Sequence, residues 1–503
     1  MALYPILLAG TLVVELLNVS GVSPFAAVRA MVVALIVALL VAWAGRVFLR
    51  DRDRGGIVAA LWVLTLLGGD DPRLALAILA ATALLLAERY LLPPERQMIP
   101  WARIGLVLSR LVAVFALAVA IQAIQTGALA GSVRSVTHET PLRPAAAKAA
   151  PDSTDPDIYL ILLDGHARSD VLADVFGRDG TAFTRALESD GFEVAPRSRS
   201  NYTQTGETLT SMFSQAQLQD VPRMADLLAL DEDQPPGGIV RDVINDNATW
   251  TFLRDRGYEI DAVSSGFEQV VIREADRFVD TGQLNEFELA VLKRSIAGRL
   301  LDALAPDVAS AQQRDRIRGA FDALATAPSW IGDGPQFVFV HVPSPHPPWV
   351  FEADGSPRTV SFRDVWLEES PDTTGLTVPQ LKAGYADQVA DVDRRMLEAL
   401  PKLDAAIAAR GRPAVVIVFS DHGSWIGTDA DMRLRFKNLL AVRSSERTVT
   451  FEPNLTLVNL LPSLFEQLFG VEWVRRPDTQ YRFGATSAFE LFAVDDPDAS
   501  ASP

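Results

Sequence analysis

Three stretches of the sequence carry side chains suited to metal-assisted catalysis. The first, Ser198–Phe213 (SRSNYTQTGETLTSMF), is rich in hydroxyl groups and has Gly206 directly after Thr205. The start of a helix presents free backbone N–H groups and the positive end of the helix dipole, so it can hold an anion. A threonine placed there loses its proton more easily and becomes a nucleophile if a metal ion lies beside it. Thr205 is therefore our candidate nucleophile.

The other two stretches supply candidate metal ligands. Asp164 follows an apolar run in LLDG, and the pair Asp421-His422 follows another in FSDHG. Two carboxylates and an imidazole suit a divalent cation with one coordination position left open. The chain contains no cysteine, so any metal must be held by oxygen and nitrogen ligands. An Asp-Gly pair after a strand is most often only a turn, but the combination of these motifs favours a site for one divalent ion, whether Zn, Mn, Mg or Ca.

Three histidines are candidates for contacts with the substrate. His346 lies in HVPSPHPPW, where prolines favour a rigid, non-helical loop. A histidine on such a loop can protonate a leaving oxygen or hold an anionic group near neutral pH. His341 still belongs to the preceding apolar run, so a hydrogen-bonded core histidine is the alternative for it. His166, two residues after Asp164, is a weaker candidate for substrate contact.

The elements that must position these residues have the pattern of an α/β domain. Continuous apolar runs predict buried parallel strands, and each run leads into polar residues: Ile158–Leu163, Gln336–His341 and Ala414–Phe419. Helical patterns lie between these runs: Thr181–Asp190, Asn285–Leu304, Gln312–Ala325 and Val389–Leu400. This alternation predicts a mostly parallel sheet, whose ligands gather at the carboxyl ends of the strands. The polar motifs after Leu163, near His341 and after Phe419 all fall at such ends.

The first 126 residues predict a helical transmembrane domain of about five spans. Its apolar segments are Leu3–Val22, Pro24–Gly45, Gly56–Leu67, Leu74–Leu92 and Ile104–Ile124. The first, second and fifth are long enough to cross a bilayer, whereas the third is short and can instead form a re-entrant hairpin with the fourth. Arginines follow the second segment and flank the junction of the fourth and fifth, so these loops are predicted to be cytoplasmic. The N-terminus is then inside the cell, and everything after Ile124 lies on the extracytoplasmic side of the cell membrane.

The composition divides the rest of the chain, after the predicted transmembrane domain, into three parts. Residues 127–156 are rich in Ala, Ser, Thr and Pro and predict a linker. Residues 157–490 form the predicted catalytic domain, and residues 491–503 an acidic, disordered tail. The formal net charge of −17 argues against nucleic acid as a partner. The oligomeric state is left open.

Several motifs in order give the chain a specific resemblance. They are Asp157–Gly165, the LESDGFEVA stretch, Ser200–Thr205, His341 with PHPPW, Phe419–Gly423 and Arg435–Ala441. Together they resemble the sulfatase-like hydrolase/transferase branch of the alkaline phosphatase superfamily, over roughly residues 157–483. The plan of membrane spans followed by an outer domain is similar to that of lipoteichoic acid synthases and lipid A phosphoethanolamine transferases.

The resemblance implies roles for single residues. It places the nucleophile at Thr205, seven residues before Met212, with Thr203 as the alternative. It implies a metal held by Asp164, Thr205, Asp421 and His422, and a substrate-binding histidine at His346. The chain departs from the transferases in having Asp164 where they have Glu, and in lacking a histidine after His422. No Cys/Ser-x-Pro-x-Arg sequence is present, so the resemblance to sulfatases concerns the fold rather than their formylglycine reaction.

The sequence therefore predicts a membrane-anchored transferase that uses one metal ion and a threonine nucleophile. It would move a phosphoglycerol- or phosphoethanolamine-type group from a membrane lipid donor to an envelope glycan or lipid. A phosphodiesterase or sulfuric ester hydrolase of the same fold is one alternative. A non-catalytic envelope scaffold or sensor is the other.

Overall fold

The chain divides into two compact units in a computed structural model. The structure describes residues 2–20, 22–69, 71–93, 99–125, 155–222, 224, 237–330, 332–360, 374–424, 426, 432–446, 448–472, 474–483, 491–494 and 498. The predicted linker, apart from residues 155 and 156, and most of the predicted tail lie outside these residues. The first unit contains the N-terminal helices, and the second contains the sheet.

In the first unit, helices follow the predicted apolar segments. They are α1 (Tyr4–Ser20), α2 (Pro24–Leu49), α3 (Arg52–Leu67), α4 (Pro72–Leu91) and α5 (Trp101–Gln125). Three of them, α2, α4 and α5, are long and apolar enough to cross a membrane. Helices α1 and α3 have 17 and 16 residues, which is short of the roughly 20 that a bilayer needs. The count of five spans therefore stays a prediction.

Glycines allow α2 and α3 to pack closely. A Cβ atom added at Gly45 would lie 2.6 Å from the carbonyl oxygen of Gly55, and one at Gly55 would lie 2.7 Å from the carbonyl carbon of Gly45. The two backbones therefore touch at this point. The turn between the helices is fixed by Asp51, whose side chain accepts hydrogen bonds from the N–H groups of Asp53 and Arg54.

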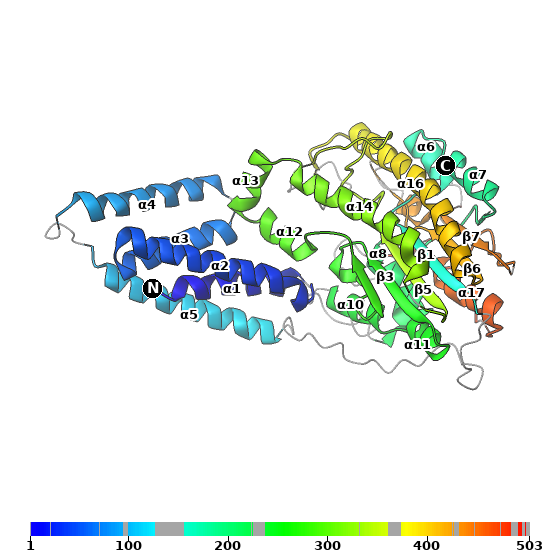
Figure 1. Ribbon diagram of the computed structural model, residues 1–503, viewed down its shortest axis with the longest axis horizontal. Helices are drawn as coiled ribbons and strands as arrows, with labels where there is room; N and C mark the ends of the chain where they lie inside the picture. The colour runs from blue at the N-terminus through cyan, green and yellow to red at the C-terminus, as the bar shows by residue number, and fades with distance from the viewer. Residues whose placement is uncertain are drawn as a thin grey trace. The chain divides into compact units, whose positions relative to one another are not determined.

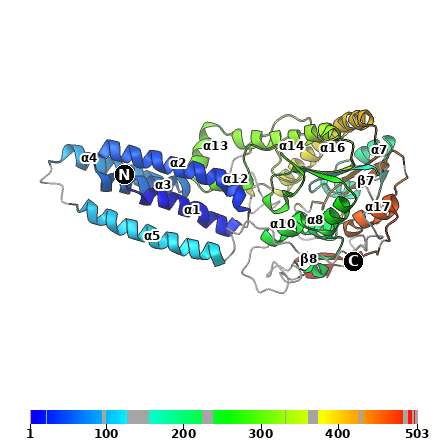
Figure 2. The same ribbon diagram turned by 60° about the horizontal axis from the view of Figure 1, so that its bottom comes forward.

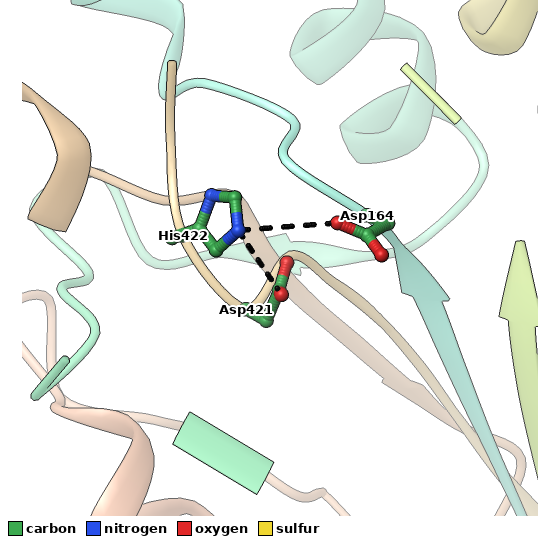
Figure 3. Close-up of side chains that lie close together, drawn as sticks. All are labelled: Asp164, Asp421 and His422. Carbon is green, nitrogen blue, oxygen red and sulfur yellow. Dashed lines mark ion pairs between the residues drawn. The ribbon is translucent and has the colours of Figure 1, made fainter. Parts of the chain in front are cut away.

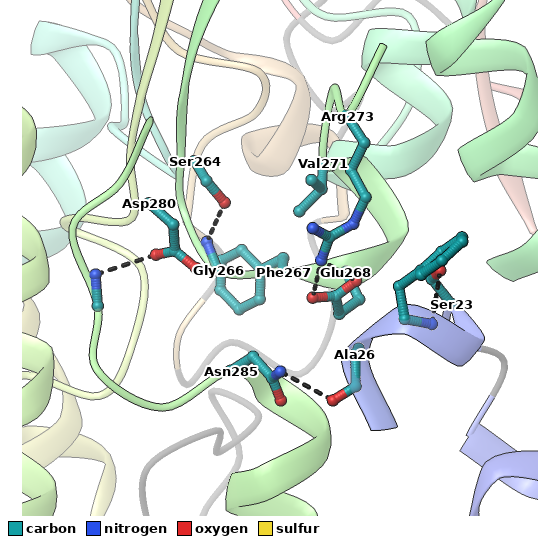
Figure 4. A network of polar contacts seen from close by, with 12 residues as sticks. Ser23, Ala26, Ser264, Gly266, Phe267, Glu268, Val271, Arg273, Asp280 and Asn285 are labelled. Carbon is teal, nitrogen blue, oxygen red and sulfur yellow. Dashed lines mark hydrogen bonds and ion pairs between the residues drawn. The ribbon is translucent and has the colours of Figure 1, made fainter. Parts of the chain in front are cut away.

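The boundary of the second unit differs from the predicted 157–490. Residues Leu284–Val308 belong to the first unit, and the predicted helix Asn285–Leu304 is two helices there, α12 (Glu286–Lys293) and α13 (Ile296–Leu304). Asn285 caps α12 and donates a hydrogen bond from Nδ2 to the carbonyl oxygen of Ala26 at 2.9 Å, as Figure 4 shows. The sequence shows an ordinary amphipathic stretch here and does not reveal which unit it packs on.

The second unit is built on a seven-stranded sheet of order β2-β7-β6-β1-β5-β3-β4 (Figure 1). Its strands are β1 (Asp157–Leu163), β2 (Glu193–Val194), β3 (Glu259–Ser264), β4 (Arg277–Asp280), β5 (Gln336–Val342), β6 (Ala414–Phe419) and β7 (Leu440–Ser444). The pairs among β6, β1, β5, β3 and β4 are parallel, whereas β7 is antiparallel to both β6 and β2. The predicted mostly parallel sheet is confirmed.

Helices cover both faces of this sheet. They are α6 (Ser169–Phe176), α7 (Thr181–Ser189), α8 (Thr205–Ser214), α10 (Gly237–Asn245), α11 (Ala248–Asp255), α14 (Val308–Thr326), α16 (Val378–Arg410) and α17 (Leu460–Phe469). Alternate residues of β1 enter opposite cores, because side chains of a strand alternate between its faces. Leu160 packs with α8, α10, α11 and α17, and Ile161 packs with α7, α14 and α16. Figure 2 shows α8 and α10 on the side of the sheet away from α14 and α16.

Short elements complete the second unit. Short 3₁₀ helices among the described residues connect the main elements: η2 (Leu218–Asp220), η3 (Glu268–Val270), η4 (Ala327–Ser329), η6 (Met432–Phe436) and η7 (Leu457–Asn459). Strands β8 (Gln480–Phe483) and β9 (Leu491–Val494) form an antiparallel pair. The prediction that the disordered tail begins at residue 491 is therefore wrong, since its first four residues are a strand.

Candidate metal centre and catalytic site

The order of the strands brings three polar segments to one edge of the sheet. β1 lies between β5 and β6, with Leu162 level with both His341 and Phe419. Because the three strands are parallel, their carboxyl ends meet at that edge. Asp164 leaves β1 there and Asp421 leaves β6 there, as the sequence predicts.

Asp164, Asp421 and His422 come together in a buried cluster (Figure 3). One ligand atom from each lies within 4.8 Å of the others. The Nε2 atom of His422 is 3.4 Å from Asp421 Oδ2 and 3.9 Å from Asp164 Oδ1. Neither of these two carboxylate oxygens has a hydrogen-bond partner among the described residues, although both are buried.

The hydrogen bonds around this cluster leave lone pairs pointing inward. Nδ1 of His422 lies 2.9 Å from the carbonyl oxygen of Gly423, so it is the protonated nitrogen and Nε2 keeps its lone pair. Asp421 Oδ1 accepts a hydrogen bond from the N–H of Gly165 at 3.0 Å. Burial lowers the pKa of His422, which favours the neutral form that binds metals. Two buried anionic oxygens beside a neutral imidazole nitrogen fit a divalent cation, since unpaired buried charges are otherwise costly.

His341 supports one of the carboxylates from the neighbouring strand. Its Nε2 lies 2.8 Å from Asp164 Oδ2, and the ring is buried. Burial by itself raises the pKa of Asp164, but nearby His346, His341 and His422 outweigh it and lower the pKa to about 2. Asp164 is therefore ionised at any physiological pH, with His341 fixing its orientation in the way that outer groups orient metal ligands.

His346 lies beside the same carboxylate residue but is only partly buried. Its backbone N–H donates to the carbonyl oxygen of Asp164 at 2.9 Å, and its Nδ1 lies 2.7 Å from the carbonyl oxygen of Pro347. Its ring meets the ring of Phe267 edge-on, with centroids 5.2 Å apart. If Nδ1 is the protonated nitrogen, Nε2 is the atom left to exchange a proton with a ligand.

His166 has a different environment from the other two histidines. Its Nε2 lies 2.8 Å from Asp393 Oδ1 on α16, its Nδ1 lies 2.9 Å from the carbonyl oxygen of Ala167, and the side chain is buried. Arg178 also pairs with Asp393, at 3.0 Å. These contacts favour a role in holding α16 to the loop after β1.

The helix α8 begins at Thr205, with Gln204 as its N-cap residue. Thr205 is partly buried, whereas Thr203 is buried and its carbonyl oxygen accepts a hydrogen bond from Nε of Arg435. The charge of Arg435 also acts with burial to lower the pKa of His422. Arg435 thus lies near both the start of α8 and the candidate metal ligands.

Backbone hydrogen bonds tie the same two segments together. The N–H of Ser200 donates to the carbonyl oxygen of Phe436 at 2.8 Å, and the N–H of Gly423 donates to that of Arg435 at 2.7 Å. The segment that leads into α8 and the loop that carries His422 are therefore both bound to η6.

The sequence did not single out three residues of this region: Glu207, Gln269 and Phe267. Glu207 is buried, and burial raises its pKa to about 7. A Cβ atom added at Gly206 would lie 3.3 Å from Cδ and Nε2 of Gln269, which places that amide beside the residue after Thr205. Gln269 and Phe267 both come from the loop after β3. Nothing in their residue types marked that loop, because only the folded sheet brings it to this edge.

The chain is similar to several solved structures of enzymes. No protein-family model and no curated protein sequence matches it. The C-terminal periplasmic domain of EcEptC from Escherichia coli, in complex with zinc, matches with 12% identity and a TM-score of 0.43, over 68% of this chain and 94% of that one. The integral membrane lipooligosaccharide phosphoethanolamine transferase A from Neisseria meningitidis matches with 15% identity and a TM-score of 0.37, over 82% and 76%.

A third match is a hydrolase. The phosphonate monoester hydrolase of Agrobacterium radiobacter has 13% identity and a TM-score of 0.43, over 65% of this chain and 75% of that one. The similar structures thus include phosphoethanolamine transferases and a hydrolase, and another is described as a protein in the alkaline phosphatase superfamily. Since these TM-scores lie below 0.5, the function has to be argued from this chain's own residues.

Proposed function

We propose that this protein is a membrane-anchored, metal-dependent transferase of a phospho-substituent, of the phosphoglycerol or phosphoethanolamine type. The observation that carries the proposal is a pair of buried carboxylate oxygens, Asp164 Oδ1 and Asp421 Oδ2, that have no hydrogen-bond partner among the described residues and face Nε2 of His422 at 3.9 and 3.4 Å. The start of α8, with Thr205, is tied to the same edge of the sheet through η6. A cation site beside a hydroxyl at a helix N-terminus suits attack on a phosphate ester.

Asp164, Asp421 and His422 would hold the divalent ion, with Thr205 Oγ1 as the further ligand that the resemblance implies. When bound, the ion supplies Lewis-acid chemistry, which lowers the pKa of a coordinated hydroxyl and neutralises charge on a phosphate oxygen. His341 keeps Asp164 ionised and correctly oriented. The N–H of Gly165 orients Asp421 by donating a hydrogen bond to its Oδ1 at 3.0 Å.

The reaction has two displacement steps. Oγ1 of Thr205 gives its proton to water and attacks the phosphorus of the lipid donor, and the bond between phosphorus and the lipid oxygen breaks. His346 gives a proton to the departing lipid oxygen, and a phosphothreonine ester remains. In the second step a hydroxyl of the acceptor gives its proton to His346 and attacks the same phosphorus. The bond between phosphorus and Oγ1 breaks, and Thr205 takes back a proton from water. Water in place of that hydroxyl would make the protein a phosphodiesterase.

The apolar helices support a location in the membrane. The helices α2, α4 and α5 are long and apolar enough to cross a membrane. Four arginines lie in the last turn of α2, the first turn of α3 and the turn that joins them: Arg46, Arg50, Arg52 and Arg54. They favour a cytoplasmic position for this turn and a catalytic domain on the outer side of the inner membrane. A lipid donor and an envelope glycan or lipid acceptor suit that position, because confinement to a membrane raises the effective concentration of the donor.

Intact mass of the full-length protein tests the proposal. Wild type and Thr205→Ala would be incubated in detergent with a membrane lipid extract and a divalent metal. A metal-dependent adduct on wild type alone, mapped to Thr205 by fragmentation, is the expected result, and its mass identifies the transferred group.

Thr203→Ala is the matched control, because Thr203 has the same side chain two residues earlier and should keep the adduct. An adduct that moves to Thr203 would reassign the nucleophile. If wild type bound metal but formed no adduct with any lipid fraction, covalent catalysis by threonine would be refuted. Accumulation of a modified glycan or lipid separates a transferase from a hydrolase.

A further inference from the structure

The helix pair α12–α13 is anchored on the N-terminal end of α2. Phe287 is fully buried in a cluster with Ala26. The guanidinium of Arg29 pairs through Nε and Nη2 with both carboxylate oxygens of Glu288. Together with the hydrogen bond from Asn285 to Ala26 (Figure 4), these contacts fix α12 to the first turns of α2.

This anchor places the pair at the level where α2 leaves the membrane. α2 has 26 residues, or about 39 Å at 1.5 Å per residue, which is somewhat longer than the hydrocarbon core of a bilayer. Its first turns expose Phe25 (67%) and Val28 (55%) together with Arg29, whose side chain is 59% exposed, a mixture of apolar and basic side chains that suits the edge of a bilayer. A segment bound to the first turns of such a helix therefore lies at the boundary between lipid and water. α13 in turn contacts α3 of the same unit.

α13 exposes an apolar stripe at this level. Leu300 is 52% exposed and Leu304, one turn further, is 83% exposed. Residues 291–301 (VLKRSIAGRLL) contain three basic residues, Lys293, Arg294 and Arg299, and α13 carries one acidic residue, Asp302. Exposed leucines on one face of a helix with lysine and arginine around it are typical of helices that lie in a membrane interface and contact anionic headgroups.

We propose that α13 lies flat in the headgroup region of the outer leaflet. Leu300 and Leu304 then point into the acyl boundary, and Lys293, Arg294 and Arg299 contact anionic lipid headgroups. The proposal rests on the membrane location given above for α1–α5. It assigns a lipid-binding surface to a segment that the chain order places inside the catalytic domain.

The absence of cysteine from the chain makes a direct test simple. Single cysteines at Leu304, Val33 and Asp322 would each carry a fluorescent probe in the full-length protein. Val33 is 54% exposed on α2 and serves as the lipid-facing control, and Asp322, an exposed residue of α14, serves as the water-facing control. The protein would be reconstituted in vesicles of phosphatidylcholine and phosphatidylglycerol with brominated acyl chains, which quench probes in lipid.

The probe at Leu304 should be quenched at least about half as strongly as the probe at Val33, because interfacial helices insert roughly 5–10 Å. The probe at Asp322 should be unaffected. Leaving out phosphatidylglycerol should weaken quenching at Leu304 and leave Val33 unchanged. Since Leu304 is so exposed, its replacement by cysteine should not disturb folding.

Other results would overturn the proposal. Quenching at Val33 with none at Leu304 beyond that at Asp322 would show that α13 is not in lipid. Efficient disulfide formation between two Leu304→Cys chains would identify a second copy as the partner of the stripe. Absence of quenching at Val33 would refute the membrane location in the proposed function. The probe at Val33 therefore distinguishes a wrong membrane location from a wrong placement of α13 alone.

Discussion

Replacing Asp421 with asparagine should stabilise the metal-free protein and abolish its response to metal. Asp421 is fully buried, and its Oδ2 has no hydrogen-bond partner among the described residues. Asn keeps a carbonyl oxygen at Oδ1, so the hydrogen bond from the N–H of Gly165 can persist. The substitution therefore removes one charge with little change of shape.

The magnitude follows from the geometry of the cluster. Carboxylate oxygens of Asp164 and Asp421 lie within 4.8 Å of each other. Two unit negative charges at that distance repel by about 3 kcal/mol at an effective dielectric constant of about 20. The hydrogen bonds from His341 and Gly165 offset part of this, so we expect Asp421→Asn to gain about 1–2 kcal/mol without metal, or roughly 1–3 °C in Tm.

A bound metal should reverse the order of stability. At a concentration of about 100 times its Kd, a metal adds about 2.7 kcal/mol to the protein that binds it. Only wild type should gain this, since the variant lacks one anionic ligand. The assay is thermal unfolding of full-length protein in detergent, followed by tryptophan fluorescence, in EDTA and then with Zn²⁺ or Mn²⁺.

Asp255→Asn is the matched control, because Asp255 is exposed on α11 and its loss should leave both curves unchanged. The reasoning would be refuted if Asp421→Asn were less stable than wild type in EDTA and still gained the same stabilisation from metal. That result would mean that repulsion between the two carboxylates does not destabilise the metal-free protein and is not relieved by a bound cation.

Three further predictions concern other parts of the molecule. His341→Gln should weaken metal affinity about 10–100-fold, as measured by competition with a chelator. The Tm of this variant in EDTA should change little. An unchanged metal affinity would show that His341 does not orient Asp164 for metal binding. Burial raises the pKa of Asp261 to about 7. The folded protein therefore keeps a proton that the unfolded chain releases near pH 4. The contribution of this group to the free energy of unfolding falls as the pH rises from about 4 to 7. Asp261→Asn should therefore raise the stability at pH 8 by about 1–2 kcal/mol, with a gain that shrinks toward pH 4 in denaturation curves; a gain independent of pH would contradict this. Gly55→Val should collide with the backbone of Gly45 and lower the folded, monodisperse yield in detergent, whereas Gly69→Ala, where an added Cβ meets no described atom within 4 Å, should behave like wild type.

The central sheet and the buried cluster of Asp164, Asp421 and His422 were predictable because both depend on local signals. Runs such as Ile158–Leu163 are apolar throughout, as strands buried on both faces must be. Neighbouring parallel strands end at the same edge of the sheet. Asp164 and Asp421 could therefore be predicted to lie close together, although they are more than 250 residues apart in the sequence. The orienting contact from His341 was beyond the sequence, because it depends on the register of β5 against β1.

The remaining features depend on tertiary contacts that leave no local mark. Phe287 occupies an amphipathic pattern that would serve equally well against a sheet or against another helix, so the assignment of α12 to the first unit could not be predicted. Gln269 reaches Gly206 only because the loop after β3 bends toward the start of α8. Residues 491–494 read as the start of an acidic tail, but pairing with β8 gives them a strand conformation.

The position of α12 and α13 in the chain has a consequence for the order of synthesis. β5 lies between β1 and β3 in the sheet, yet it is translated after α12 and α13, which pack on α2. β1 and β3 are therefore joined into one sheet only after the chain has passed through α12 and α13. A ribosome that stalls before residue 336 would leave β1 and β3 without the strand that joins them.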